Sequence, residues 1–435
     1  MMTHAVSALR LSLCLAMLSA GPAFAQFPSP AESHDDDSRS VAYVYVQTLN
    51  GIDVYRAAFS GKLKLVSGSP FSTAGDLIGS TGKYVISLDT DIPGTANVGM
   101  AHLHSYPVAA NGAIGAQAAQ IDTSTYAGGS CGQTSAGVLD RTSQYVQVLY
   151  NPSIYVSSPC TTYQTFALAN TSGAFTFLGD AVVNPDISAE LDPIAITGNN
   201  QFAYALDTDV FSAVYAGFIR ESNGALANLT FSETDPPPPP PFEFFAWLVA
   251  ADPANHLAMA LGSLEFFGSP LVTVGPTRLA SYTVDASGNI ASTNTPQNMP
   301  VPDVGPTLMR ISPSGTLLAV AGGPCNWCSI SVLTAQDGLE VFHFNGADPI
   351  TPFTGVLTTD PIDQLEWDNN NHLFALSDSA NKLYVFTATP SGFTQAPGSP
   401  YTVANPNGVS PNGMAVVPIG RHRDADMDDD SREDP

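Results

Sequence analysis

A pattern of short strands and turns repeats along this chain and restricts its fold more than any other feature. The most regular part is a run of four to six residues rich in Val, Tyr, Phe, Leu and Ala. It occurs at residues 42–47, 84–88, 145–149, 202–206, 257–261, 317–321 and 373–376. Seven repeats of roughly 40–60 residues, each long enough for four short strands, are typical of β-propeller blades.

Polar turns that contain a glycine separate these runs and indicate β-hairpins. Gly adopts positive φ at little steric cost, so Asn-Gly and Ser-Gly between alternating apolar segments favour a tight turn. The turns contain Gly61, Gly112, Gly173, Gly224, Gly288, Gly346 and Gly392. The 36 Gly and 35 Pro of the chain are therefore those of a turn-rich β protein.

The order of strands predicts how the ring closes. We label the strands of a blade A to D from the axis to the rim, and the seven runs are the B strands. The chain enters the repeat at a B strand, and its missing A strand follows only at residues 414–418. Pairing of this last strand with the first blade would remove the open sheet edges. Sustained helical periodicity is absent. We therefore predict an all-β, seven-bladed propeller with four antiparallel strands per blade.

The N-terminal 25 residues have the features of a secretory signal peptide. Arg10 precedes an apolar run at residues 11–20, and Ala23-Phe24-Ala25 is a small-residue cleavage site. We predict cleavage after Ala25 and a secreted or periplasmic protein. The mature chain then comprises a disordered acidic leader at residues 26–40, the propeller at 41–418 and a disordered acidic tail at 419–435. Later segments lack the roughly 18 consecutive apolar residues of a membrane span.

Composition limits the partners of the protein. With 44% hydrophobic and only 12% charged residues, the chain is expected to bury a large core. Its 14 basic and 39 acidic residues give a net charge of −25, which disfavours nucleic acid and anionic membranes. We expect a monomer that binds a small-molecule or carbohydrate-like ligand, or another protein.

Four cysteines remain after the signal peptide, and an exported protein with an even number of cysteines is expected to form disulfides. Cys131–Cys160 and Cys325–Cys328 are the more local of the three pairing schemes. A redox function of the second pair would require Cys325 at a helix N-terminus. Glycine, proline and β-forming residues flank it instead, so we predict a structural loop closure.

Several segments resemble a known family. Ser67-Gly68-Ser69-Pro70-Phe71, Gly398-Ser399-Pro400-Tyr401 and Ile311-Ser312-Pro313-Ser314-Gly315 look like the repeat of the bacterial seven-bladed lactonase propellers, which include 6-phosphogluconolactonase-like and carboxymuconate-cyclase-like proteins. The resemblance covers residues 41–418. It implies the same fold and lactone hydrolysis as an activity.

The residues that the family uses for lactone chemistry are not retained. They include the Arg and His of a Gly-Pro-Arg-His phrase, which corresponds here to Gly305-Pro306-Thr307-Leu308. Neither Thr307 nor Leu308 can act as a general base. This departure favours a ligand-binding or interaction propeller, and the alternative is a hydrolase of lactones or related sugar acids that uses other residues.

The A strands of the repeat contain two charged candidates for such a site. Aligned on their turns, the strands place Leu77, Val138, Ala195, Ala250, Arg310, Glu366 and Ala415 at one position. Because A strands line the axis, Arg310 and Glu366 of neighbouring blades are expected to lie together at the channel. The pair is either an ion pair between blades or a catalytic unit, with Glu366 as general base and Arg310 as carboxylate anchor.

Acidic loops supply the second set of candidates. Loops after B strands and before A strands emerge at one end of a propeller, and we predict an acidic face there. We take Asp89, Asp207, Asp378 and the loop residue Trp327 as candidate ligand-binding residues. No cofactor is required by the sequence, but Asp89, Asp91, Asp207 and Asp209 are candidate calcium ligands. Their other role is to cap turns. His102 and His104 share one face of a strand but lack a third ligand nearby in sequence, so we expect ordinary strand histidines.

Overall fold

The computed structural model describes residues 39–89, 101–123, 133–151, 162–182, 194–209, 212–238, 243–265, 272–273, 276–322, 336–389, 392–403 and 413–419. All regular elements in these ranges are strands, and no helix there is long and apolar enough to cross a membrane. The predicted signal peptide, the predicted acidic leader before residue 39 and tail after residue 419, four cysteines, Asp91 and Trp327 lie outside the described residues.

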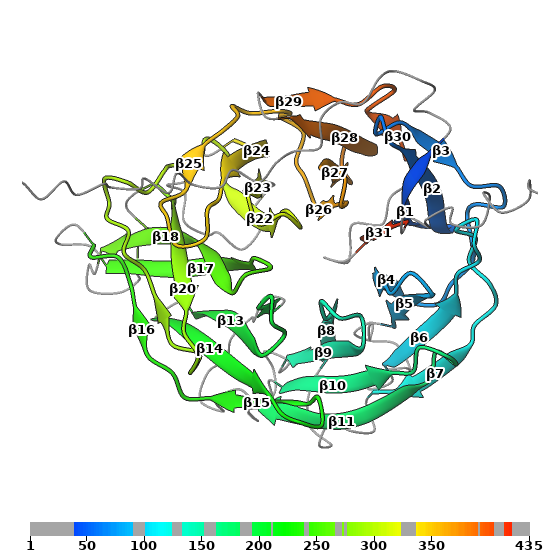
Figure 1. Cartoon of the computed structure of the whole chain (residues 1–435), viewed down its shortest axis with the longest axis horizontal. Helices are drawn as coiled ribbons and strands as arrows, with labels where there is room; N and C mark the ends of the chain where they lie inside the picture. Colours follow the sequence, from blue (N-terminus) through cyan, green and yellow to red (C-terminus); the bar gives the residue numbers. More distant parts are fainter. Residues whose placement is uncertain are drawn as a thin grey trace, which may run out of the picture. The chain divides into compact units, whose positions relative to one another are not determined.

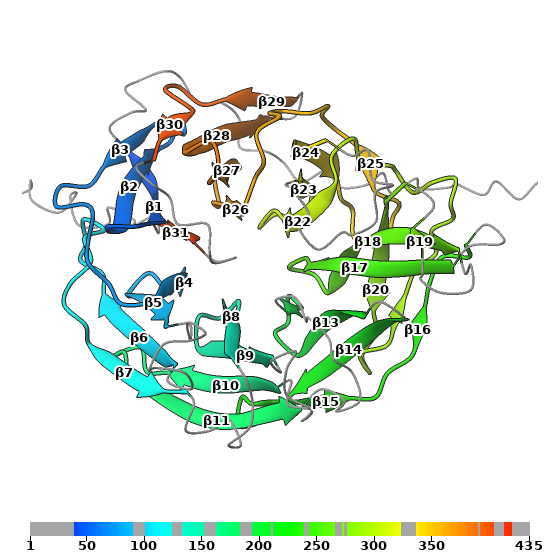
Figure 2. The same ribbon diagram turned by 180° about the vertical axis from the view of Figure 1, so that it is seen from behind.

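Seven antiparallel sheets stand as blades around a central axis (Figures 1 and 2), which confirms the predicted propeller. The innermost A strands, from blade 1 to blade 7, are β31 (Met414–Pro418), β4 (Asp76–Ser80), β8 (Gln133–Leu139), β12 (Ala195–Ile196), β17 (Glu243–Ala251), β22 (Pro306–Ile311) and β26 (Gln364–Trp367). The B strands are β1 (Ser40–Thr48), β5 (Tyr84–Leu88), β9 (Tyr145–Asn151), β13 (Phe202–Asp209), β18 (His256–Glu265), β23 (Leu317–Gly322) and β27 (His372–Ser377). All seven predicted B strands are present.

The outer half of each blade is more variable. The C strands are β2 (Gly51–Ala58), β6 (His102–Pro107), β10 (Thr162–Leu168), β14 (Ser212–Arg220), β20 (Arg278–Val284), β24 (Gly338–His343) and β28 (Lys382–Thr389). The D strands are β3 (Leu63–Leu65), β7 (Ala119–Asp122), β11 (Phe175–Val182), β15 (Leu226–Leu229), β21 (Ile290–Ala291), β25 (Thr351–Pro352) and β29 (Gly392–Gln395). Blade 5 also has β16 (Glu233–Thr234) and β19 (Val272–Thr273), and blade 7 also has β30 (Tyr401–Thr402).

The C-terminal strand closes the ring as predicted. β31 pairs antiparallel with β1 from Ala42↔Pro418 to Val46↔Met414. Hydrogen bonds continue beyond the strand, because the amide of Gln47 donates to the carbonyl of Gly413 at 2.7 Å and that of Ile419 donates to Val41 at 2.8 Å. The first and last described segments therefore belong to one sheet, and blade 1 is complete only when both are present.

The core lies between the blades. The described residues form seven apolar clusters, and each contains buried residues of two neighbouring blades. Successive strand residues point to opposite sheet faces, so one B strand contributes to two clusters. In β23, Leu318 and Val320 pack toward blade 5, whereas Leu317 and Ala319 pack toward blade 7. Burial on both faces explains why the B strands are continuous apolar runs.

The turn glycines have a second role in packing. Gly112 and Gly288 have φ of +85° and +82°, as hairpin turns require. In six blades the turn glycine also packs against a ring in the preceding blade, which belongs to a residue near the start of the B strand. A Cβ added to the glycine would lie only 2.3–3.3 Å from that ring. The pairs are Gly112 with Tyr43, Gly173 with Tyr84, Gly224 with Tyr145, Gly288 with Phe202, Gly346 with His256 and Gly61 with His372.

One of the two histidines in these contacts was expected to face solvent but is buried. His256 and His372 occupy equivalent A–B turns, and both would be expected to face solvent. His372 is instead 1% exposed, with its Nδ1 2.7 Å from Asp368 Oδ2 and its Nε2 3.1 Å from the carbonyl oxygen of Phe59 in blade 1. His256, whose side chain is 28% exposed, pairs in the same way with Asp252 at 2.9 Å. Both histidines take the place of the aromatic ring that packs against a turn glycine.

Candidate functional site

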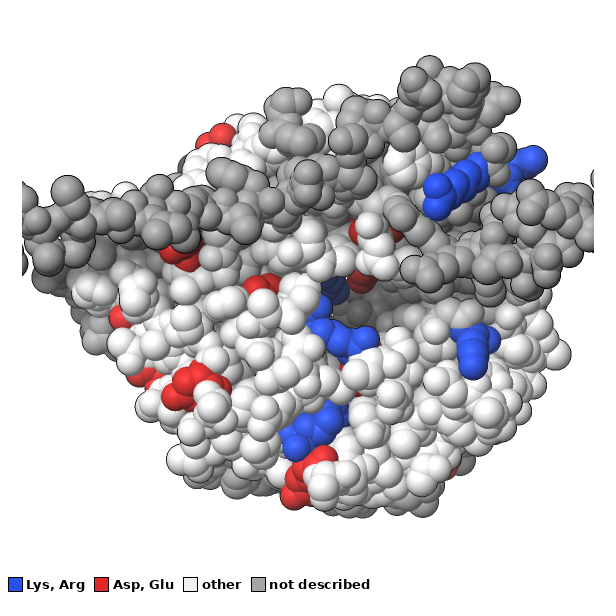
Figure 3. Space-filling view, in the orientation of Figure 1, with Lys and Arg blue, Asp and Glu red and all other residues white. Residues whose placement is uncertain are grey.

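The central channel is the candidate site. It encloses about 480 Å³ and is lined by A strands of blades 1 to 7. Small or apolar residues form most of the wall, among them Gly79, Ala195, Ala250 and Ala415. Gly79 lines the channel in place of Leu77, which is fully buried between blades 1 and 2. The β4–β5 turn is two residues shorter than the β8–β9 turn, so Gly79, paired with Ile86, takes the place of Val138, paired with Gln147. Figure 3 shows the ring hollowed at its centre, with basic side chains at the rim of the hollow.

Arg310 and Glu366 meet on the channel wall, as the repeat alignment predicts. Arg310 Nε lies 3.6 Å from Glu366 Oε1. The backbone around the pair is held by two hydrogen bonds: Arg310 Nη1 donates to the carbonyl of Met309 at 3.1 Å, and Trp367 Nε1 donates to the carbonyl of Arg310 at 3.3 Å. The long Nε–Oε1 distance and the single contact leave this pair weaker than a bidentate arginine–carboxylate bridge.

Burial within the channel raises the pKa of Glu366, and the positive charge of Arg310 opposes this effect. The side chain is 36% exposed, but only to the channel, where protein surrounds the carboxylate. Loss of bulk water around a carboxylate disfavours its charged form. Glu366 therefore has the environment of a group that exchanges protons closer to neutral pH than an ordinary carboxyl does.

The raised pKa predicts how Glu366→Gln changes stability with pH. Native Glu366 retains its proton at pH values above its ordinary pKa of 4.5, where the unfolded chain has lost it. The wild type therefore loses stability as pH rises through this window, whereas the substituted glutamine side chain cannot ionise. We expect the variant to gain stability relative to wild type between about pH 4 and pH 7, measured by urea unfolding at both values. A relative loss over the same interval would show that the ion pair with Arg310 outweighs burial.

Arg141 is a channel residue that the repeat alignment did not identify. It lies in the turn between β8 and β9 and reaches across to two other blades. Its Nε donates to the carbonyl of Ile196 at 3.0 Å, and its Nη2 donates to the carbonyl of Ala251. Removal from bulk water lowers the pKa of Arg141, and Asp252 opposes this shift. The sequence did contain a signal for Arg141. The equivalent turn position is uncharged in blades 4 to 7, where it holds Gly198, Pro253, Pro313 and Asn369.

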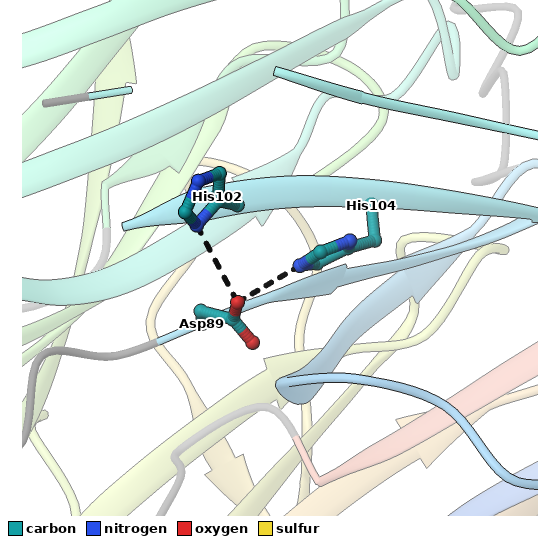
Figure 4. A group of neighbouring side chains, drawn as sticks. All are labelled: Asp89, His102 and His104. Atoms are coloured by element: carbon teal, nitrogen blue, oxygen red, sulfur yellow. Dashed lines mark hydrogen bonds and ion pairs between the residues drawn. The ribbon is translucent and has the colours of Figure 1, made fainter. Parts of the chain in front are cut away.

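The other described candidate ligand-binding residues lie in separate blades. Asp89 follows β5 in blade 2, Asp207 lies in β13 of blade 4, and Asp378 follows β27 in blade 7, so no two of them occupy neighbouring blades. The backbone amide of Asp378 donates to Asp363 Oδ2 at 2.7 Å. The carboxylate of Asp363 therefore caps this turn, as acidic turn residues often do. Asp89 has different partners: His102 and His104 (Figure 4).

Fold and site define the class: a seven-bladed β-propeller with a charged central channel. The chain is similar in structure to the periplasmic gluconolactonase of Pseudomonas aeruginosa, with a TM-score of 0.52 and 13% identity over 85% of this chain and 98% of that one. It is also similar to proteins named as candidate 6-phosphogluconolactonases from Bacteroides uniformis (TM-score 0.52, 13% identity, 87% and 100% coverage) and Bacteroides fragilis (0.51, 13%, 89% and 100%). No family model and no curated protein matches the sequence. The resemblance to lactonase propellers is thus confirmed for the fold.

Proposed function

We propose that this protein is an exported propeller that binds a small carboxylate-bearing ligand, such as a sugar acid, in its central channel. The observation that carries the proposal is the presence of two guanidinium groups, those of Arg141 and Arg310, on the wall of a cavity of about 480 Å³. Cavities of about 300–1,000 Å³ accommodate small molecules. Guanidinium groups bind carboxylates through paired, charge-assisted hydrogen bonds.

Hydrogen bonding within the channel supports this function. Among the described residues, Arg310 Nη2 and Arg141 Nη1 have no hydrogen-bond partner. The remaining wall combines the acidic residues Asp140 and Glu366 with apolar residues such as Ala195, Ala250 and Ala415, against which the ligand's carbon skeleton can pack. The predicted signal peptide and the periplasmic location named for one structural neighbour support export.

Binding of gluconate and of neutral glucono-δ-lactone tests the proposal. Arg310→Met is expected to weaken gluconate binding about 10- to 100-fold, because a hydrogen bond to a charged group contributes about 1.5–3 kcal/mol. Lactone affinity should change much less. Lys83→Met is the matched control, because Lys83 lies in the β4–β5 turn but outside the channel wall. Calorimetry that finds no gluconate binding, or equal binding by Arg310→Met and wild type, would contradict the proposal.

Lactone hydrolysis is the second candidate function, and the raised pKa of Glu366 is the observation that favours it. A carboxyl group that titrates nearer neutrality is a better general base for activating water. A panel of sugar lactones followed by proton release measures this activity directly. Turnover that Glu366→Gln abolishes while gluconate still binds would identify a hydrolase, and absence of turnover across the panel would leave the binding function.

A further inference from the structure

Three side chains of blade 2 form a cluster outside the channel. Asp89 directly follows β5, and His102 and His104 alternate along the adjacent strand β6. Figure 4 shows both imidazole rings turned toward one carboxylate oxygen. Asp89 Oδ2 lies 3.0 Å from His104 Nε2 and 3.6 Å from His102 Nδ1, and the three potential ligand atoms lie within 4.8 Å of one another. The third ligand that the sequence did not supply nearby is Asp89, which sheet pairing brings to the two histidines.

Hydrogen bonds orient the ring of His104. Its Nδ1 lies 3.1 Å from Gln117 Oε1, which also accepts the hydroxyl of Tyr106 at 3.4 Å, while Gln117 Nε2 donates to Gln120 at 3.0 Å. Because Oε1 is an acceptor, this contact favours the tautomer with the proton on Nδ1. His104 Nε2 is directed at the carboxylate of Asp89, 3.0 Å from Oδ2, where either a proton or a metal ion can join the two groups.

We propose that Asp89, His102 and His104 form a binding site for a divalent transition-metal ion, for which Zn²⁺ is the best match. Two imidazoles and one carboxylate are a typical ligand set for zinc with an open position. At Zn–N and Zn–O distances of about 2.0–2.2 Å, tetrahedral ligand atoms stand about 3.3–3.6 Å apart. The observed 3.0 and 3.6 Å bracket these values. Gln117 acts as the outer partner that orients a metal-bound histidine.

Exposure and ligand chemistry define the site further. His104 is 4% exposed, whereas the side chains of His102 and Asp89 are 26% and 33% exposed. The cluster is therefore anchored on one side and open to solvent on the other, where water completes the coordination. Two nitrogen ligands disfavour calcium, which prefers six to eight oxygens. Asp89, a candidate calcium ligand in the sequence, thus binds a softer ion in this proposal.

Calorimetry on the tag-free mature protein, stripped with a chelator and dialysed, tests the site with ZnCl₂ alone. We expect one Zn²⁺ per chain and no heat with CaCl₂. Asp89→Asn and His102→Gln alter partly exposed side chains, and each should weaken Zn²⁺ binding by about 100-fold or more, with thermal melting as the check of folding. His343→Gln is the matched control, because His343 is an exposed C-strand histidine whose ring contacts that of Phe353. It should leave binding unchanged.

Gln117→Ala tests the outer contact separately. We expect about 10- to 100-fold weaker Zn²⁺ binding and an altered visible spectrum of the Co²⁺-substituted protein, which a purely structural role would not change. Absence of Zn²⁺ binding would show that a proton alone joins His104 and Asp89 and would overturn the proposal. Zn²⁺ binding that persists at full affinity in Asp89→Asn and His102→Gln, or preferential calcium binding, would also overturn it.

Discussion

Ending the chain at Val403, before the closing strand, is expected to cost the propeller about 5 kcal/mol or more of its free energy of unfolding, which is most of the stability of a typical domain. β31 is the A strand of blade 1 and pairs with β1 along its length. Its residues also belong to two core clusters, since Met414 packs between blades 7 and 1 and Ala415 packs between blades 1 and 2. Truncation therefore opens the ring, exposes a strand edge and uncovers two inter-blade cores.

A second truncation controls for loss of the tail. Ending the chain after Ile419 keeps β31 and removes only residues 420–435, so its urea midpoint should match that of the full chain. Addition of a peptide of residues 413–419 to the shorter chain should restore part of the stability. Equal midpoints for the two truncated chains would contradict a closing role of β31.

His372→Ala is expected to lower the free energy of unfolding by about 3–5 kcal/mol, because it leaves the buried carboxylate of Asp368 without its imidazole partner. Both side chains are almost fully buried, at 1% and 0% exposure. The ring also joins two blades, since His372 Nε2 lies 3.1 Å from the carbonyl oxygen of Phe59. The substitution thus weakens the seam between blade 7 and blade 1, next to the point of ring closure.

The equivalent pair in blade 5 is the matched control for His372. His256 and Asp252 have the same spacing and contact, but the side chain of His256 is 28% exposed. Asp252 is itself only 3% exposed, but water can reach its carboxylate from the exposed side of His256, so His256→Ala should cost less than His372→Ala. Chemical unfolding of both variants measures the difference. Similar losses would show that burial does not decide the strength of these pairs.

Sequence periodicity predicted the propeller well because its signals are local. The seven B strands are apolar runs because both faces of each are buried, and turns such as Asn111-Gly112 favour hairpins through backbone conformation alone. Ring closure was also predictable, since counting strands within the repeat leaves blade 1 without its A strand. The proximity of Arg310 and Glu366 followed from the same counting.

The residues that sequence analysis missed depend on contacts between distant segments. Arg141 lies in a turn, and only the curvature of the ring brings it to the carbonyls of Ile196 and Ala251. His372 was expected to face solvent because a turn position does not show which residues of the next blade cover it. Asp89 joins His102 and His104 only through the β5–β6 pairing.

The sequence by itself determined the number of blades, their strand order and the closing strand, because strand periodicity and turn chemistry depend on neighbouring residues. Tertiary structure alone decided that Arg141 joins Arg310 and Glu366 at the channel, that His372 is buried between blades 7 and 1, and that Asp89, His102 and His104 meet in blade 2. These features arise from side chains that meet across strands and blades, and their distances depend on register and ring curvature, which no local pattern records.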